Sequence, residues 1–320
     1  MSNAKIGMEA GPMKSKKVIP VRFGEDVGPV IPNRHIRRWV AVAIVILISL
    51  LILQSMITNP NYQWSIVFKY FTASSVLSGL LTTIELTVIC MALGLFLGMI
   101  LAIMRMSPIP VLRVAAAIYV WAFRATPLLI QLIIFYNFSA LYPKLAFTLP
   151  FDLTYSLNMN AVLTPFLVAV LAFSLNEAAY MGEIIRGGVL SVDTGQSEAA
   201  KALGMKANTI WYRIVLPQAM RSIIPATGSQ VISMLKGTSI ISFIAFPELL
   251  YSVQEIYSRT FQTIPLLIVA VLWYLLVTSV LMVGQVFVEK HYSRGYDGVR
   301  NGTNKRTVDA LLNDAGGNGA

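Results

Sequence analysis

The apolar segment from Trp39 to Ile57, which contains no charged residue, limits the possible fold more than any other feature. A run of roughly 18 or more apolar residues without charge is typical of a helix that spans a bilayer. The composition agrees, since 56% of the residues are apolar, 12% are charged and the mean hydropathy is +0.68. A soluble domain, about half apolar and a quarter charged, cannot bury this much apolar surface. The sequence therefore predicts an integral membrane protein.

Apolar segments of this kind recur along the chain, and we predict an all-α membrane bundle of about six transmembrane helices. The predicted spans cover residues 39–57, 77–104, 126–142, 161–181, 223–246 and 264–288. The segment VLRVAAAIYVWAFRA, between the second and third spans, predicts a shorter helix that lies along the interface or enters the membrane at a slant. Residues 1–36 are polar and lack an apolar period, which predicts a tail outside the membrane.

The lysines and arginines are distributed unevenly between the two sides of this predicted topology. With the N-terminus inside, the outer loops hold only Lys69, Lys144 and Arg259. The inner segments hold Arg34, Arg37, Arg38, Arg105, Arg113, Arg186, the basic residues of 198–221, Lys290, Arg294, Arg300, Lys305 and Arg306. This asymmetry predicts that both termini are cytoplasmic. Topology thus accounts for the net charge of +10, and we expect no nucleic-acid partner.

The same topology places the loop EAAKALGMKANTIWYRIVLP, between the fourth and fifth spans, on the cytoplasmic side. We expect two helical pieces in it. The first exposes the small residues Ala199, Ala200, Ala202 and Gly204, which let another backbone approach closely. Glu198 is expected in its first turn, where the helix dipole favours an anion. Pro217 predicts a break before the next span. These features alone leave open an ordinary loop helix that packs on its own bundle.

The spacing within this loop resembles a known motif, the EAA loop of bacterial ATP-binding-cassette importer permeases. The matching residues are Glu198, Ala199, Ala200, Gly204, Ile214, Leu216 and Pro217. The stretches FRATPLLIQL, FSLNEAAYMGEIIRGGVLSVDTGQSEAAKALGM and MLKGTSIISFIAFPELL are similar to the polar amino acid group of that family, which includes histidine, glutamine, arginine and opine transporters. The sequence departs from the group at Ala125 and at Gly237, where many members carry glycine and aspartate.

The resemblance covers residues 76–290 and implies an importer-permease fold with a coupling loop at 191–222. It implies that the matching residues of the loop dock on a separate ATPase dimer, with a second permease subunit, same or related, and an extracytoplasmic solute-binding protein as further partners. It implies a polar amino acid as substrate and a multi-pass location in the bacterial plasma (inner) membrane. Residues 37–58 would then form an additional N-terminal transmembrane helix, and residues 291–320 a cytoplasmic C-terminal tail.

Energy for transport must come from another polypeptide. The chain contains no Gly-Lys dipeptide and so lacks the GxxxxGK[ST] loop that cradles nucleotide phosphates. We therefore expect no cofactor bound by this chain, with ATP hydrolysed by the partner subunit. His35 and His291 stand at opposite ends of the sequence and Cys90 is the sole cysteine, so neither a Ser-His hydrolase site nor a zinc site is predicted.

Polar residues inside or flanking the predicted spans are candidates for the substrate path, because each costs several kcal/mol when unpaired in a bilayer. They are Glu85, Arg124, Gln131, Glu177 and Lys236. A substrate with an ammonium and a carboxylate needs groups of both signs. The alternative is that an acid pairs with Lys236 or Arg124 only to hold the bundle together. An ion-coupled secondary transporter of amino acids is the other functional alternative, but internal repeats typical of that class are not apparent.

Overall fold

The protein is described from a computed structural model, which describes residues 36–149 and 153–292. The tails predicted over residues 1–36 and 291–320 therefore lie almost wholly outside the described residues. The chain divides into two units, residues 1–59 and 60–320. In the first unit the described structure is one helix, α1 (Ile36–Thr58), which coincides with the first predicted span. By itself it is long and apolar enough to cross a bilayer.

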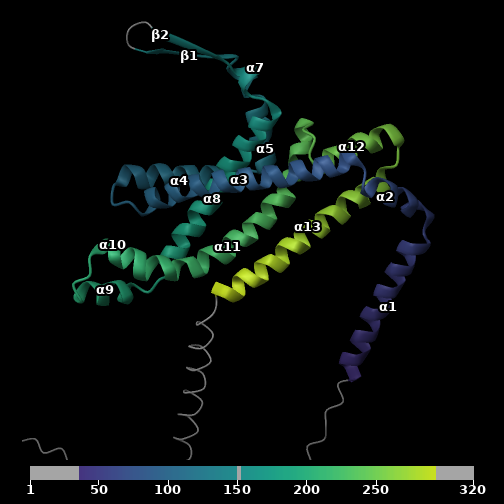
Figure 1. Cartoon of the computed structure of the whole chain (residues 1–320), viewed down its shortest axis with the longest axis horizontal. Coiled ribbons are helices and arrows are strands. Elements are labelled where there is room, and N and C mark those ends of the chain that lie inside the picture. The colour runs from purple at the N-terminus through teal and green to yellow at the C-terminus, as the bar shows by residue number, and fades with distance from the viewer. Residues whose placement is uncertain (1–35, 150–152, 293–320) are drawn as a thin grey trace, which may run out of the picture. The chain divides into compact units, whose positions relative to one another are not determined.

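The second unit is almost entirely helical (Figure 1). Its elements are η1 (Pro60–Tyr62), α2 (Trp64–Phe71), α3 (Ser74–Met106), α4 (Pro110–Ala125), α5 (Leu128–Tyr136), α6 (Phe138–Leu141), β1 (Lys144–Leu149), β2 (Leu153–Asn158), α7 (Met159–Val162), α8 (Pro165–Leu190), α9 (Thr194–Ala202), α10 (Ala207–Ile210), the π-helical η2 (Trp211–Val215), α11 (Leu216–Gly237), the 3-10 helix η3 (Thr238–Ile244), α12 (Leu249–Thr260) and α13 (Thr263–Tyr292).

Four of the described helices, α1, α3, α8 and α13, are each long and apolar enough to span a membrane. Two bent pairs raise the number to six if each is counted as one span: α4 with α5, bent by 100°, and residues 207–244 with α12, bent by 44°. The predicted all-α membrane fold is confirmed. The third predicted span is divided differently, because Pro127 ends the helical path after α4, and α5 is only about 14 Å long at 1.5 Å per residue.

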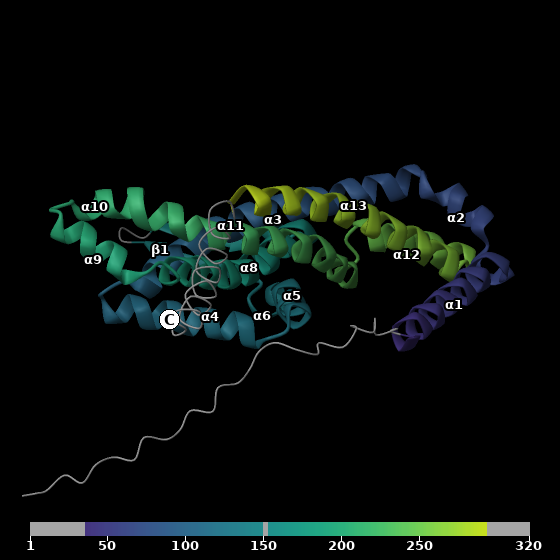
Figure 2. The same ribbon diagram turned by 90° about the horizontal axis from the view of Figure 1, so that it is seen from below.

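Helix α8 is the centre of this unit and contacts α3, α4, α5 and α11. In the view of Figure 2 it lies between α13 and α4. The contact with α3 is the closest. A Cβ atom built on Gly98 would lie 2.6 Å from Cβ of Met181 and 2.9 Å from the backbone nitrogen of Gly182. Gly94 and Gly98 thus form a GxxxG pair that lets two helix backbones approach, as is common where helices associate inside lipid.

The two ends of α8 carry different connections. A two-stranded antiparallel hairpin, β1 with β2, precedes α8, and Lys144 pairs with Asn158 at its base. The coupling loop follows the other end of α8, and a helix of 26 residues separates the two by roughly 39 Å. Figure 1 shows the hairpin and α9–α10 on opposite sides of the unit. The hairpin, α2 and α12 were not predicted from the apolar runs, since none of them alone is long and apolar enough to span a membrane.

Candidate functional site

The coupling loop, residues 191–222, begins with α9, which is capped by Asp193. The side chain of Asp193 accepts a hydrogen bond of 2.8 Å from the backbone N–H of Gly195 and so satisfies one of the free donors of the first turn. Glu198 lies in the middle of α9 and not in its first turn. The expected position of Glu198 was therefore wrong, because the helix starts at Thr194, one turn earlier than the motif suggested.

Gly204 ends α9 in a Schellman motif. Its φ is +74°, a left-handed conformation that a residue with a Cβ adopts only with strain. The N–H of Gly204 donates to the carbonyl of Lys201 (2.9 Å), and the N–H of Met205 donates to the carbonyl of Ala200 (3.1 Å). A Cβ on Gly204 would meet no atom within 4 Å, so backbone conformation and not space requires the glycine.

The second limb of the loop continues into the membrane without a break. The chain is helical from Ala207 through α10, η2 and α11 to Ile244, so the break predicted at Pro217 is wrong. A proline inside a helix lacks the N–H for the usual bond and crowds the preceding turn. The residues just before Pro217, Trp211–Val215, form a π-helical turn, and this wider turn accommodates the proline.

Most, but not all, of the small residues of the loop are exposed. Ala199, Ala202 and Gly204 are exposed, as predicted, whereas Ala200 is 3% exposed; Ile210 of the second limb is also buried. The loop contains one large apolar residue at its tip, Leu203, with 82% of its surface exposed. Of the remaining motif residues, Ile214 and Leu216 are half-buried and Pro217 is exposed.

A hollow of about 430 Å³ lies between the end of α8 and the two limbs of the loop. Its wall is apolar where α8 and the second limb line it, with Leu190, Ile210 and Trp211 among the residues. On the α9 side Glu198 and Lys201 line it. Glu198 is thus positioned at the rim of a concave surface, with its side chain exposed.

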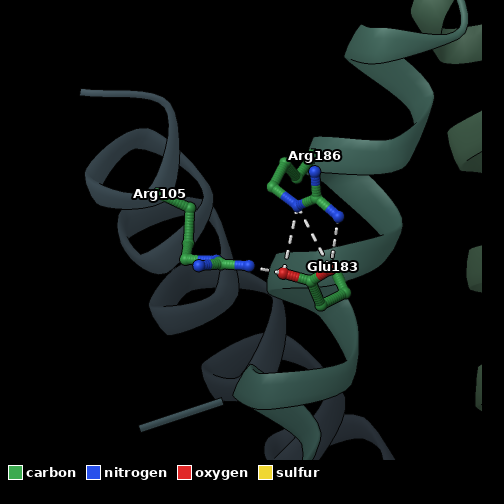
Figure 3. A network of polar contacts seen from close by, with 3 residues as sticks. All are labelled: Arg105, Glu183 and Arg186. Carbon is green, nitrogen blue, oxygen red and sulfur yellow. Dashed lines mark hydrogen bonds and ion pairs between the residues drawn. The ribbon is translucent and has the colours of Figure 1, made fainter. Parts of the chain in front are cut away.

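The loop is joined to the bundle next to a three-residue ion cluster (Figure 3). Glu183 on α8 accepts from Nη2 of Arg186 at 2.7 Å and from Nε of Arg105, near the end of α3, at 3.3 Å. All three side chains are partly exposed, so each pair alone stabilises little, but the shared carboxylate ties the ends of two helices together. From the sequence, Arg105 and Arg186 were predicted on the inner side of the membrane, whereas their shared partner Glu183 was not predicted.

Of the predicted path residues, Glu177 is buried within the chain itself. Only 3% of its surface is exposed, and its Cβ and Cγ pack against Gly94 on α3. Its Oε2 accepts a hydrogen bond of 3.2 Å from Nε2 of Gln230 on α11. Its Oε1 has no hydrogen-bond partner in the described structure. Glu177 therefore lies at the junction of α3, α8 and α11.

Gln131 is also buried and bonds to the protein. Its Nε2 donates to the carbonyl oxygens of Phe123 (2.9 Å) and Thr126 (3.1 Å), which the 100° bend between α4 and α5 leaves without helical partners. Nε2 also lies 2.6 Å from Oγ1 of Thr126. Its Oε1 accepts from Nδ2 of Asn176 on α8 at 3.0 Å. Gln131 thus holds the bend against α8.

The other three candidates, Glu85, Arg124 and Lys236, have exposed side chains. Arg124 lies over the ring of Tyr180, 5.2 Å from its centroid. Among the described residues the ion pairs are Arg105–Glu183, Arg186–Glu183 and Arg259–Glu255. Pairing of Glu85 or Glu177 with Lys236 or Arg124, the structural alternative, is therefore not observed within the described chain.

A buried acid that the sequence analysis missed is Glu248, which is fully buried. It caps α12 by accepting from the N–H groups of Leu250 (2.9 Å) and Tyr251 (2.8 Å), and it also accepts from the hydroxyl of Tyr274 on α13 (3.1 Å). The Pro-Glu step just before an apolar helix was the available signal. Because both carboxylate oxygens are bonded, we assign Glu248 a structural role.

Comparison with known proteins identifies the chain. The family described as "Binding-protein-dependent transport system inner membrane component" matches residues 94–294. The chain belongs to this family. The resemblance to ATP-binding-cassette importer permeases is thereby confirmed, and the chain is a permease subunit of that transporter class.

Individual relatives agree with this assignment. The arginine transport system permease protein ArgU of Corynebacterium glutamicum is 44% identical over 82% of this chain and 83% of its own length. The L-cystine transport system permease protein TcyB of Bacillus subtilis is 39% identical over 68% and 86%. A crystal structure titled "an amino acid ABC transporter with histidines" has a TM-score of 0.60 at 32% identity, covering 68% of this chain and 94% of the solved one.

Proposed function

We propose that this chain is the membrane permease of an ATP-driven importer of polar amino acids. The family match over residues 94–294, together with a complete coupling loop, is the observation that carries the proposal. The names of the arginine and cystine permeases support the substrate class, and arginine is the first substrate to test because the 44% identity extends over most of both chains.

The coupling loop transmits the work of a separate ATPase dimer. Its exposed face, with Ala199, Ala202 and Leu203, has small side chains and a projecting apolar side chain that suit docking in a groove. Glu198 borders the hollow behind this face. The second limb continues into α11, so a displacement of the loop reaches the spans through covalently continuous helix.

The substrate path lies between this chain and a second permease subunit. Glu85, Arg124 and Lys236 support this, because charged groups exposed on the surface of a membrane bundle cannot face lipid without a cost of several kcal/mol. A water-filled path against a partner subunit removes that cost. Gln131 is not proposed as a substrate contact, since its amide already bonds to the backbone at the bend.

The orientation follows from the charge distribution. With both termini in the cytoplasm, the coupling loop faces the ATPases, and the β1–β2 hairpin, about 39 Å away along α8, faces the extracytoplasmic solute-binding protein. The protein is then a multi-pass component of the plasma membrane, and this chain binds no cofactor of its own.

The test is reconstitution of the chain in liposomes with the ATPase and the solute-binding protein encoded beside its gene. Uptake of labelled arginine should require ATP inside, on the ATPase side, and the binding protein outside. Cystine and glutamine, offered separately, define the range of substrates. Uptake that follows an ion gradient and proceeds without the ATPase would refute the proposal.

A further inference from the structure

Helices α8 and α11 flank the coupling loop in the sequence, since α8 leads into it and α11 leads out of it. Close to the loop they touch through Gly188 on α8 and the side chain of Ile223 on α11. The contact is so close that a Cβ on Gly188 would overlap Ile223. This first contact is apolar and fixes distance but not register, because dispersion and apolar packing are non-directional.

The second connection is polar and lies deeper in the bundle. The Gln230–Glu177 hydrogen bond is roughly 16 Å from Gly188 along α8 and roughly 10 Å from Ile223 along α11. Among the described residues it is the part-buried side-chain hydrogen bond between α8 and α11; an exposed one joins Ser191, the C-cap of α8, to Ser222 of α11 beside the loop (3.3 Å). In lipid, where no hydrophobic force drives helices together, such polar contacts fix how helices pair.

Glu177 also connects this pair to α3. Its Cγ would be 2.6 Å from a Cβ on Gly94, so the acid fits only because position 94 is a glycine. Glu177 is 3% exposed, and its Oε1 lacks a partner, so the bond from Gln230 is its one hydrogen bond within the described structure. Sliding of α11 along α8 would leave both carboxylate oxygens without a donor in an apolar region, which is strongly unfavourable.

We propose that the Glu177–Gln230 bond locks α8 and α11 into one lever, so that displacement of the coupling loop moves α3 instead of sliding α11 past α8. The proposal rests on the proposed function and gives Glu177 and Gln230 positioning roles without contact to substrate. An acceptor at position 177 and a donor at position 230 are required; a negative charge at 177 is not.

The measurement is the ratio of substrate transported to ATP hydrolysed, in the reconstituted full complex. Gln230→Met removes the donor and should lower this ratio about tenfold, as expected for one lost hydrogen bond to a charged group, while the KM for substrate stays unchanged. Glu177→Gln keeps an acceptor for Gln230 and should keep the ratio within about threefold of wild type. If Glu177 instead attracted the substrate's ammonium, Glu177→Gln would raise the KM, and the proposal would be overturned.

Two further variants separate coupling from simple stability. The double variant Glu177→Met with Gln230→Met replaces both polar groups by apolar ones and should restore the Tm of the subunit while the transport ratio stays low. Recovery of both quantities would mean that the pair only fills space, which overturns the proposal. Gln285→Met is the matched control, since Gln285 bonds to Ser229 of α11 from α13 (2.9 Å) and should leave the ratio unchanged.

The outcome for wild type separates this proposal from the proposed function. If wild-type complex transports no amino acid under ATP, the proposed function fails. If wild type transports and Gln230→Met keeps the wild-type ratio of substrate transported to ATP hydrolysed, the lever proposal is refuted while the proposed function stands.

Discussion

The α3–α8 contact and the coupling loop both depend on glycine, for opposite physical reasons. At Gly98 the backbone is ordinary helix, but a Cβ would press against Met181 and the backbone of Gly182. At Gly204 there is open space for a side chain, but φ is +74°. Inside the membrane the constraint is packing distance, because close van der Waals contact is what holds helices together there. In the polar loop the constraint is the dihedral angle that lets the last turn satisfy its carbonyls.

The largest effect is expected from Gly98→Leu, which forces a large side chain between two backbones. Overpacking of this kind costs about 3 kcal/mol or more, and we expect little folded subunit in the membrane. Yield and thermal unfolding of the purified subunit measure it. Gly284→Leu on α13 is the control, because a Cβ at Gly284 meets no atom within 4 Å. Equal losses for the two variants would refute the packing explanation.

A smaller and more local effect is expected at Gly204. Gly204→Val places a β-branched residue in the left-handed region, which costs about 1–2 kcal/mol, and should fray the end of α9 without reducing membrane insertion. Gly204→Asn should be tolerated, since asparagine adopts this conformation readily. Hydrogen exchange of residues 199–205 measures the fraying of α9 in the two variants. ATPase activity stimulated by the binding protein measures whether each loop still functions. If Gly204→Asn is as damaging as Gly204→Val, docking space and not φ governs this position.

At the other end of α9, Asp193→Ala should destabilise the helix by about 1 kcal/mol, the usual cost of a lost N-cap. Amide exchange should increase in the first turn, at Gly195 and its neighbours, and leave α8 unaffected. Asp193→Asn keeps an acceptor oxygen for the N–H of Gly195 and should behave as wild type. Loss of α8 protection in Asp193→Ala would show that the loop and the bundle unfold as one.

The smallest effect compares two adjacent glycines of α8. Gly187→Ala meets no atom within 4 Å and should stabilise the isolated subunit by about 0.5–1 kcal/mol, through a lower entropy of the unfolded chain. Gly188→Ala should destabilise it, because the new methyl group collides with Ile223. Thermal unfolding of the two variants in the same detergent provides the comparison. The explanation by contact with Ile223 is refuted if both variants shift the Tm in the same direction.

The sequence by itself determined the membrane class, the long spans and the place of the coupling loop. A bilayer demands runs of about 20 apolar residues whatever their neighbours are, so α1, α3, α8 and α13 were predictable from composition along the chain. The spacing of the residues from Glu198 to Pro217 indicated the family. The β1–β2 hairpin left a weaker signal, the alternating pattern of LTYSLN, which is short and lies between spans.

Only the tertiary structure decided which polar residues are used inside the chain and which remain on its surface. Gln131 and Glu177 looked the same in sequence as Glu85 and Lys236, yet the first two bond to groups on other helices and the second two are exposed. Burial depends on which helices meet, and the partners are distant in sequence: Gln230 is 53 positions from Glu177. A hydropathy pattern reports where a helix crosses the membrane, but not which of its faces meets another helix.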